Sequence, residues 1–98
     1  MIGEVAVQAA KLMAAENEIL QAVAEFRTAA KDAKLAGDNL AADWTGDARE
    51  AFVAEQAKAY DWQLKISDIV DAFAFSIRKT VEKYQQAEEQ IRNLIGNN

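Results

Sequence analysis

The side chains that most often carry out catalysis are scarce in this chain. Its 98 residues include no histidine and no cysteine, so the commonest general base and the nucleophilic thiol are both missing. Ser67 and Ser76 are the only serines, and neither lies in the glycine-flanked turn that presents a catalytic serine. Asp68 and Asp71 are close enough on a helix to contact a hard cation, but a solvated helix face accounts for them more simply. We therefore predict a protein that is not an enzyme and that holds no metal or cofactor.

A recognition site is better supported, and its centre is the tripeptide formed by Trp44, Thr45 and Gly46. This tripeptide interrupts two long segments of helical periodicity near the middle of the chain. Gly46 would let the chain turn tightly beside the indole ring, in a conformation that is costly for other residues. Thr45 can cap the helix that follows, by accepting a hydrogen bond from a backbone N–H of its first turn. Trp44 would then either present its ring to a partner or only close the turn.

The composition predicts that long helices position these residues. The chain has no proline and only four glycines, and residues of high helix propensity dominate it, which indicates an all-α fold. The net charge of −5 repels phosphate groups, so we expect no nucleic-acid partner. The N-terminal residues lack the basic and apolar regions of an ordinary secretory signal, and no stretch approaches the length of a membrane span. From these features alone we expect a cytoplasmic protein without stable membrane insertion.

The first helix is predicted over about residues 4–42. An apolar side chain recurs there every seven positions, and a row of alanines runs beside it, a pattern typical of left-handed, coiled-coil-like packing. The seven-residue row consists of Val5, Leu12, Ile19, Phe26, Ala33 and Leu40, and the alanine row of Ala15, Ala22, Ala29 and Ala36. These rows predict the face on which a neighbouring helix packs.

The second helix is predicted over about residues 47–95, after a turn at about residues 43–46. Its large apolar side chains follow spacings of three, four and seven residues. They are Ile66, Val70, Phe73, Ile77, Tyr84, Ile91 and Leu94. Asp47 lies in the first turn, where the helix dipole favours a negative charge.

The expected architecture is one domain over residues 1–98, a helix–turn–helix hairpin of two long antiparallel helices. Two helices cannot enclose a core, because each buries one strip and leaves the opposite side of the pair exposed. The simplest remedy is a dimer that forms a four-helix bundle. The residues expected at the dimer interface are Leu12, Ile19, Val23, Phe26, Ile66, Val70, Phe73 and Ile77.

Two short stretches of the chain resemble motifs of a known family. Residues 44–52, Trp-Thr-Gly-Asp-Ala-Arg-Glu-Ala-Phe, resemble the W-x-G-x-A-x-x-x-F stretch of the WXG one-hundred family, the early-secreted-antigen-like substrates of type VII (ESX) secretion systems. Residues 84–88, Tyr-Gln-Gln-Ala-Glu, are similar to the family's Y-x-x-x-[DE] export motif, with glutamate where aspartate is more familiar. The resemblance covers essentially the whole chain.

The resemblance implies a function in secretion. A member of this family would be synthesised and would dimerise in the cytoplasm, and would then be exported across a Gram-positive or mycobacterial envelope without a cleaved signal peptide. A membrane-bound secretion ATPase would read the export motif, here Tyr84 and Glu88. The protein would be a small secreted substrate or virulence-type effector whose partner is a second copy of itself.

The two motifs are too far apart to form one site within a single hairpin. Tyr84 lies 38 residues after Gly46, which corresponds to about 57 Å along a helix. If two hairpins pack antiparallel, Trp44 and Thr45 of one copy come level with Tyr84 and Glu88 of the other. This arrangement predicts a composite export signal that exists only in the dimer.

Two other functions remain open at this stage. The chain could be a heterodimer partner or targeting chaperone for another WXG-type protein, for another exported helical protein or for a toxin. It could also be a cytoplasmic coiled-coil adaptor without an export role. Self-association is favoured, because both helices carry bulky residues together with enough alanine to interdigitate.

Overall fold

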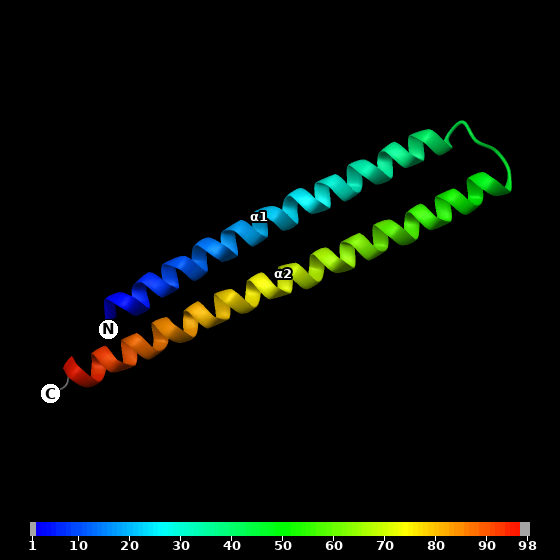
Figure 1. Ribbon diagram of the computed structural model, residues 1–98. Coiled ribbons are helices and arrows are strands. Elements are labelled where there is room, and N and C mark those ends of the chain that lie inside the picture. The colour runs from blue at the N-terminus through cyan, green and yellow to red at the C-terminus, as the bar shows by residue number, and fades with distance from the viewer. Residues whose placement is uncertain (1, 97–98) are drawn as a thin grey trace. The chain divides into compact units, whose positions relative to one another are not determined.

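The computed structural model describes residues 2–96, with their side chains except those of Ile2 and Val5. The chain forms two α-helices, α1 (Ile2–Ala41) and α2 (Asp47–Gly96), which the turn at residues 42–46 joins into a hairpin (Figure 1). Residues 2–96 contain no β-strand. The predicted all-α helical hairpin is therefore confirmed. Val5, the first member of the predicted seven-residue row, has its side chain outside the described part.

The turn is built from backbone hydrogen bonds and one glycine. At the end of α1, the Trp44 N–H donates to the carbonyl of Ala41 at 3.0 Å, and Arg49 Nε donates to the same oxygen at 2.9 Å. Gly46 has a φ of +85°, and its carbonyl accepts the first hydrogen bond of α2, from the Glu50 N–H at 3.3 Å. Gly46 is thus the residue that caps α2.

The structure corrects the role expected of Thr45. No hydrogen bond within residues 2–96 involves its hydroxyl, and the residue lies one position too early to reach the first turn as a capping side chain. The first turn of α2 instead carries Asp47 and Glu50, whose negative charges interact favourably with the helix dipole.

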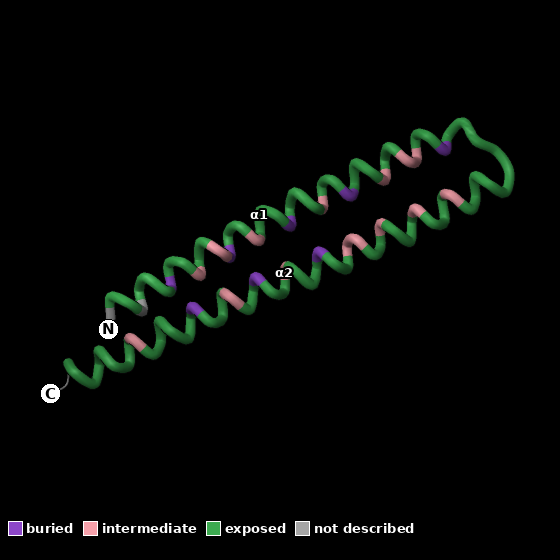
Figure 2. The backbone as a smooth tube through the Cα atoms, in the orientation of Figure 1, coloured by how far each residue is buried: buried purple, intermediate pink, exposed green. Residues whose placement is uncertain are grey.

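Contacts divide the hairpin into two compact units, one of residues 22–70 and one of residues 1–21 with 71–98. In the 22–70 unit, Val23, Ala30 and Ala41 of α1 and Ser67 of α2 are buried. In the other unit, the buried residues are Ala9 and Glu16 of α1 and Ala74 and Val81 of α2. Figure 2 shows that, within each unit, these residues lie on the sides of the helices that face each other.

The inter-helix seam has the predicted seven-residue period but a different register. On α1 it consists of Ala9, Glu16, Val23 and Ala30, and on α2 of Ser67, Ala74 and Val81. The predicted rows of bulky residues lie beside this seam: Phe26, Leu40, Ile66 and Phe73 are all exposed. Apart from Glu16, the seam residues are small or medium-sized, which lets the two helices approach closely. Several of the bulky apolar side chains beside the seam are left exposed.

Candidate functional site

Trp44 and Phe52 form the aromatic part of the turn. Their ring centroids are 5.1 Å apart with an interplanar angle of 58°, a tilted arrangement that is favourable for aromatic pairs. Phe52 is half-buried, whereas Trp44 keeps 39% of its surface exposed. The first and last residues of the 44–52 stretch are therefore in contact, and the indole both stabilises the turn and remains available to a partner.

Gly46 is required by backbone conformation and not by lack of space. A Cβ added at this position would meet no atom within 4 Å. Its φ of +85°, however, lies in the left-handed region that residues with a Cβ rarely adopt. The glycine of the tripeptide therefore sets the path of the chain from Trp44 into α2.

Tyr84 and Glu88 differ in accessibility. Tyr84 is exposed, whereas the side chain of Glu88 is only 15% exposed. Arg92 Nη2 lies 3.4 Å from Glu88 Oε1, so the carboxylate already has a cationic neighbour one turn further along α2. A receptor that reads this pair would contact the phenol ring directly and the carboxylate together with Arg92. Tyr84 and Glu88 belong to the unit of residues 1–21 and 71–98, and the turn motif belongs to the 22–70 unit.

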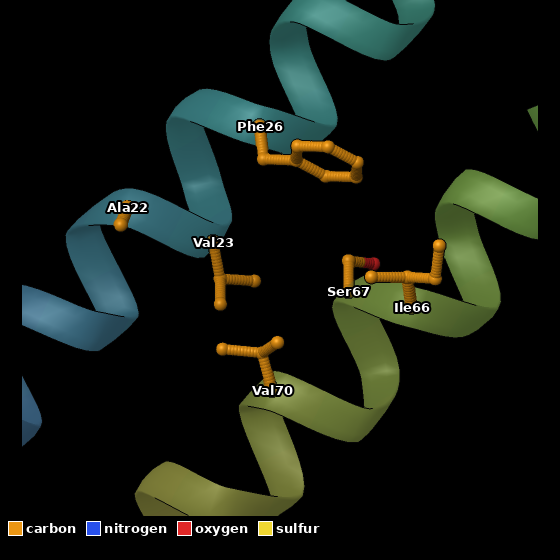
Figure 3. Close-up of a pocket in the computed structure, with 6 residues that line it drawn as sticks. All are labelled: Ala22, Val23, Phe26, Ile66, Ser67 and Val70. Carbon is orange, nitrogen blue, oxygen red and sulfur yellow. The ribbon is translucent and has the colours of Figure 1, made fainter.

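An apolar groove opens between the helices of the 22–70 unit. It has a volume of about 230 Å³, and Figure 3 shows the six residues that line it: Ala22, Val23, Phe26, Ile66, Ser67 and Val70. The single polar member, Ser67, has its hydroxyl occupied, because it donates to the Leu64 carbonyl at 2.7 Å and accepts from Arg27 Nε at 2.9 Å. The groove therefore offers a partner an apolar surface with no free polar group.

This groove brings together four of the eight residues predicted at a dimer interface. Phe26, Ile66 and Val70 are exposed, whereas Val23 is buried in the chain's own seam and has little surface left for a partner. In the other unit, Phe73 is exposed, and Leu12, Ile19 and Ile77 are half-buried.

Sequence reasoning missed an ionic pair at the seam of the unit formed by residues 1–21 and 71–98. Glu16 is only 4% exposed, and Arg78 binds its carboxylate through Nε and Nη2. The hydrogen bonds to Glu16 and its negative charge raise the pKa of Arg78 above the usual value. The sequence did contain one indication that Glu16 lies in the seam, because it is seven residues from both Ala9 and Val23.

A second cross-helix pair lies in the 22–70 unit. Arg27 of α1 donates to Asp68 Oδ1 at 2.9 Å as well as to Ser67 of α2. The Asp68 carboxylate thus forms an ion pair with Arg27. Among the described residues, no group of three or more acidic side chains is placed to hold a metal ion.

Comparison with family models found no match, and comparisons with curated proteins and with solved structures found no significant match. Neither described helix contains a stretch that is both long enough and apolar enough to cross a lipid bilayer.

Proposed function

We propose that this protein is a small, non-enzymatic member of the WXG one-hundred family that a type VII secretion system exports. The observation that carries the proposal is the turn at residues 44–52. There Gly46 takes a positive φ, and Trp44 packs on Phe52 while part of its surface stays exposed. These are the properties that a tryptophan–glycine recognition turn needs, because the ring is fixed in place and still accessible.

The exported form is a homodimer. Support comes from the apolar groove around Phe26, Ile66 and Val70, which the chain itself leaves uncovered. Large apolar surfaces that remain exposed on a small protein mark contact sites, and helical hairpins cover theirs by forming four-helix bundles. A second copy offers the same groove, so one self-complementary contact would cover both.

The export signal is composite. Trp44 and Thr45 of one copy, together with Tyr84 and Glu88 of the other, form the surface that a membrane-bound secretion ATPase reads. Export takes place without a cleaved signal peptide, after synthesis and dimerisation in the cytoplasm. The exposed surfaces of Trp44 and Tyr84 support a signal that includes both residues, because a receptor could contact either ring.

A secretion assay tests the proposal. The tagged protein is expressed in a bacterium with a type VII secretion system and in the same strain without the secretion ATPase, and the culture medium is blotted beside a cytoplasmic lysis marker. We expect the protein in the medium only when the ATPase is present, and we expect Trp44→Ala and Tyr84→Ala to remain in the cells. Trp62→Ala is the matched control, since Trp62 is also exposed but lies outside both motifs. Equal amounts in the medium of the two strains would contradict export by this route.

A further inference from the structure

We propose that a second groove, in the unit of residues 1–21 and 71–98, binds a basic amphipathic helix of a partner protein. This acidic groove has a volume of about 290 Å³. It is lined by Glu16, Leu20, Asp71, Phe75, Arg78 and Glu82. The proposal does not depend on export, because it concerns a surface outside both motifs.

The apolar part of the acidic groove comes from both helices. Leu20 of α1 is exposed, and Phe75 of α2 is 59% exposed although it is a large aromatic residue. Phe75 lies two residues from both Phe73 and Ile77, so it points about 200° away from them around α2. A dimer that covers Phe73 and Ile77 would therefore leave Phe75 open.

The charges in the acidic groove are unbalanced. Arg78 is occupied by Glu16 through hydrogen bonds of 2.9 to 3.1 Å, so this pair is neutral as a whole. Within residues 2–96, neither Asp71 nor Glu82 forms an ion pair, although Glu82 contributes to the raised pKa of Arg78. Two carboxylates thus flank an apolar surface, and neither forms an ion pair within the described residues.

The face of Phe75 already attracts a cation. Lys79 Nζ lies 5.2 Å from the centroid of the ring, at a distance where a cation and an aromatic face attract each other. A lysine or arginine of a partner could take the same position while its neighbours pair with Asp71 or Glu82.

A helix fits the acidic groove better than other basic ligands. Asp71, Phe75 and Glu82 follow one another at intervals of four and seven residues on α2, the spacing that presents side chains along one line of a helix. A helix laid into the groove would offer apolar anchors at similar intervals, with basic residues on both sides. The carboxylates and the overall charge of −5 disfavour nucleic acids and anionic membranes.

Fluorescence anisotropy with two designed peptides tests this inference. The first peptide is a fluorescein-labelled amphipathic helix with leucines at helical spacing and lysines beside them, and the second has glutamates in place of the lysines. We expect the lysine peptide to bind at least about 10-fold more tightly than the glutamate peptide. We expect Phe75→Ala to weaken binding about 10-fold and Asp71→Asn/Glu82→Gln to weaken it about 5-fold.

Matched controls locate the binding site. Trp62→Ala removes another exposed aromatic residue, and Glu18→Gln/Asp32→Asn removes the same number of charges outside the acidic groove. For both controls, the dissociation constant of the lysine peptide should stay within about 2-fold of the value for the unchanged protein. Circular dichroism should confirm that every variant remains helical. Absence of binding, equal losses in the groove and control variants, or a loss with Phe26→Ala instead of Phe75→Ala would each overturn the proposal.

Discussion

Arg78 of α2 binds the buried carboxylate of Glu16 of α1 through three hydrogen bonds of 2.9 to 3.1 Å. The pair joins the two helices of its unit at a seam that otherwise contains small apolar residues such as Ala9 and Ala74. A carboxylate in this position is tolerated because the guanidinium supplies both opposite charge and donors with matching geometry.

Loss of Arg78 should destabilise the protein more than loss of other surface arginines. Arg78→Ala leaves the Glu16 carboxylate, whose side chain is 5% exposed, buried without a partner. Arg92→Ala removes a single longer contact, of 3.4 Å, from an exposed arginine to the less deeply buried carboxylate of Glu88. We expect Arg78→Ala to lower the midpoint of thermal unfolding by several degrees and Arg92→Ala to leave it nearly unchanged. In a Glu16→Gln background the effect of Arg78→Ala should shrink, and an undiminished effect there would show that the ion pair is not its cause.

The contribution of this pair should not depend on pH near neutrality. The pKa of Arg78 is raised in the folded state, first because Glu16 accepts its hydrogen bonds and then because of the opposite charge. For a base with a raised pKa, the stability gain is complete below the unfolded-state pKa and is lost only as the pH rises through the folded-state pKa. Urea unfolding of the unchanged protein and of Arg78→Ala should therefore give the same difference in stability from about pH 6 to about pH 9.

Replacement of Gly46 should strain the turn. Gly46→Ala places a Cβ on a residue with a φ of +85°, which we expect to cost about 1–2 kcal/mol. Gly3→Ala is the control, because Gly3 lies within α1, its added Cβ would meet nothing within 4 Å, and alanine has the higher helix propensity. The check is urea unfolding of both variants. Equal stability of Gly46→Ala and the unchanged protein would contradict the assigned conformation of the turn.

Gly37 and Gln56 should be energetically coupled. A Cβ on Gly37 would overlap the Gln56 side chain, whose Nε2 donates to Asp38 Oδ1 at 2.7 Å. In the unchanged protein, Gly37→Ala should leave the free energy of unfolding nearly unchanged. Alanine gains about 1 kcal/mol in helix propensity, but its Cβ displaces Gln56 and breaks the hydrogen bond to Asp38, which is worth about as much. In a Gln56→Ala background, the same change should stabilise the protein by about 1 kcal/mol. Urea unfolding of the unchanged protein, the two single variants and the double variant gives the coupling energy, and equal effects of Gly37→Ala in both backgrounds would refute it.

The two helices and their turn could be predicted from the sequence, but the register of the seam could not. Helix propensity indicates two long helices, and Gly46 indicates where the turn between them lies, because both signals are local. The seam depends on which of two neighbouring seven-residue rows faces the other helix. Hydrophobicity favoured the row of Ile19 and Phe26, whereas close packing selects the smaller Ala9 and Ala30. The pairing of Arg78 with Glu16 could not be predicted either, because the two residues are 62 positions apart in the chain.

The exposed apolar groove should be covered by self-association. Light scattering after size exclusion should give twice the chain mass of 10.8 kDa for the unchanged protein. Phe26→Asp/Ile66→Asp should run as a monomer, because two carboxylates in the groove would lose their hydration in a dimer. The double variant Glu18→Gln/Asp32→Asn, which alters charge elsewhere, should remain a dimer. A monomeric unchanged protein would instead favour the heterodimer alternative.

The central claim is that a dimer assembles one export signal from two chains, and co-expression of two defective chains tests it most directly. Trp44→Ala and Tyr84→Ala carry different tags and are expressed singly and together in a secretion-competent strain. A mixed dimer still contains one intact Trp44 and one intact Tyr84, supplied by different chains. Neither variant should reach the medium alone, and both tags should appear there together when the two are co-expressed. Retention of both tags in the co-expressing cells, with mixed dimers present inside them, would contradict the composite signal.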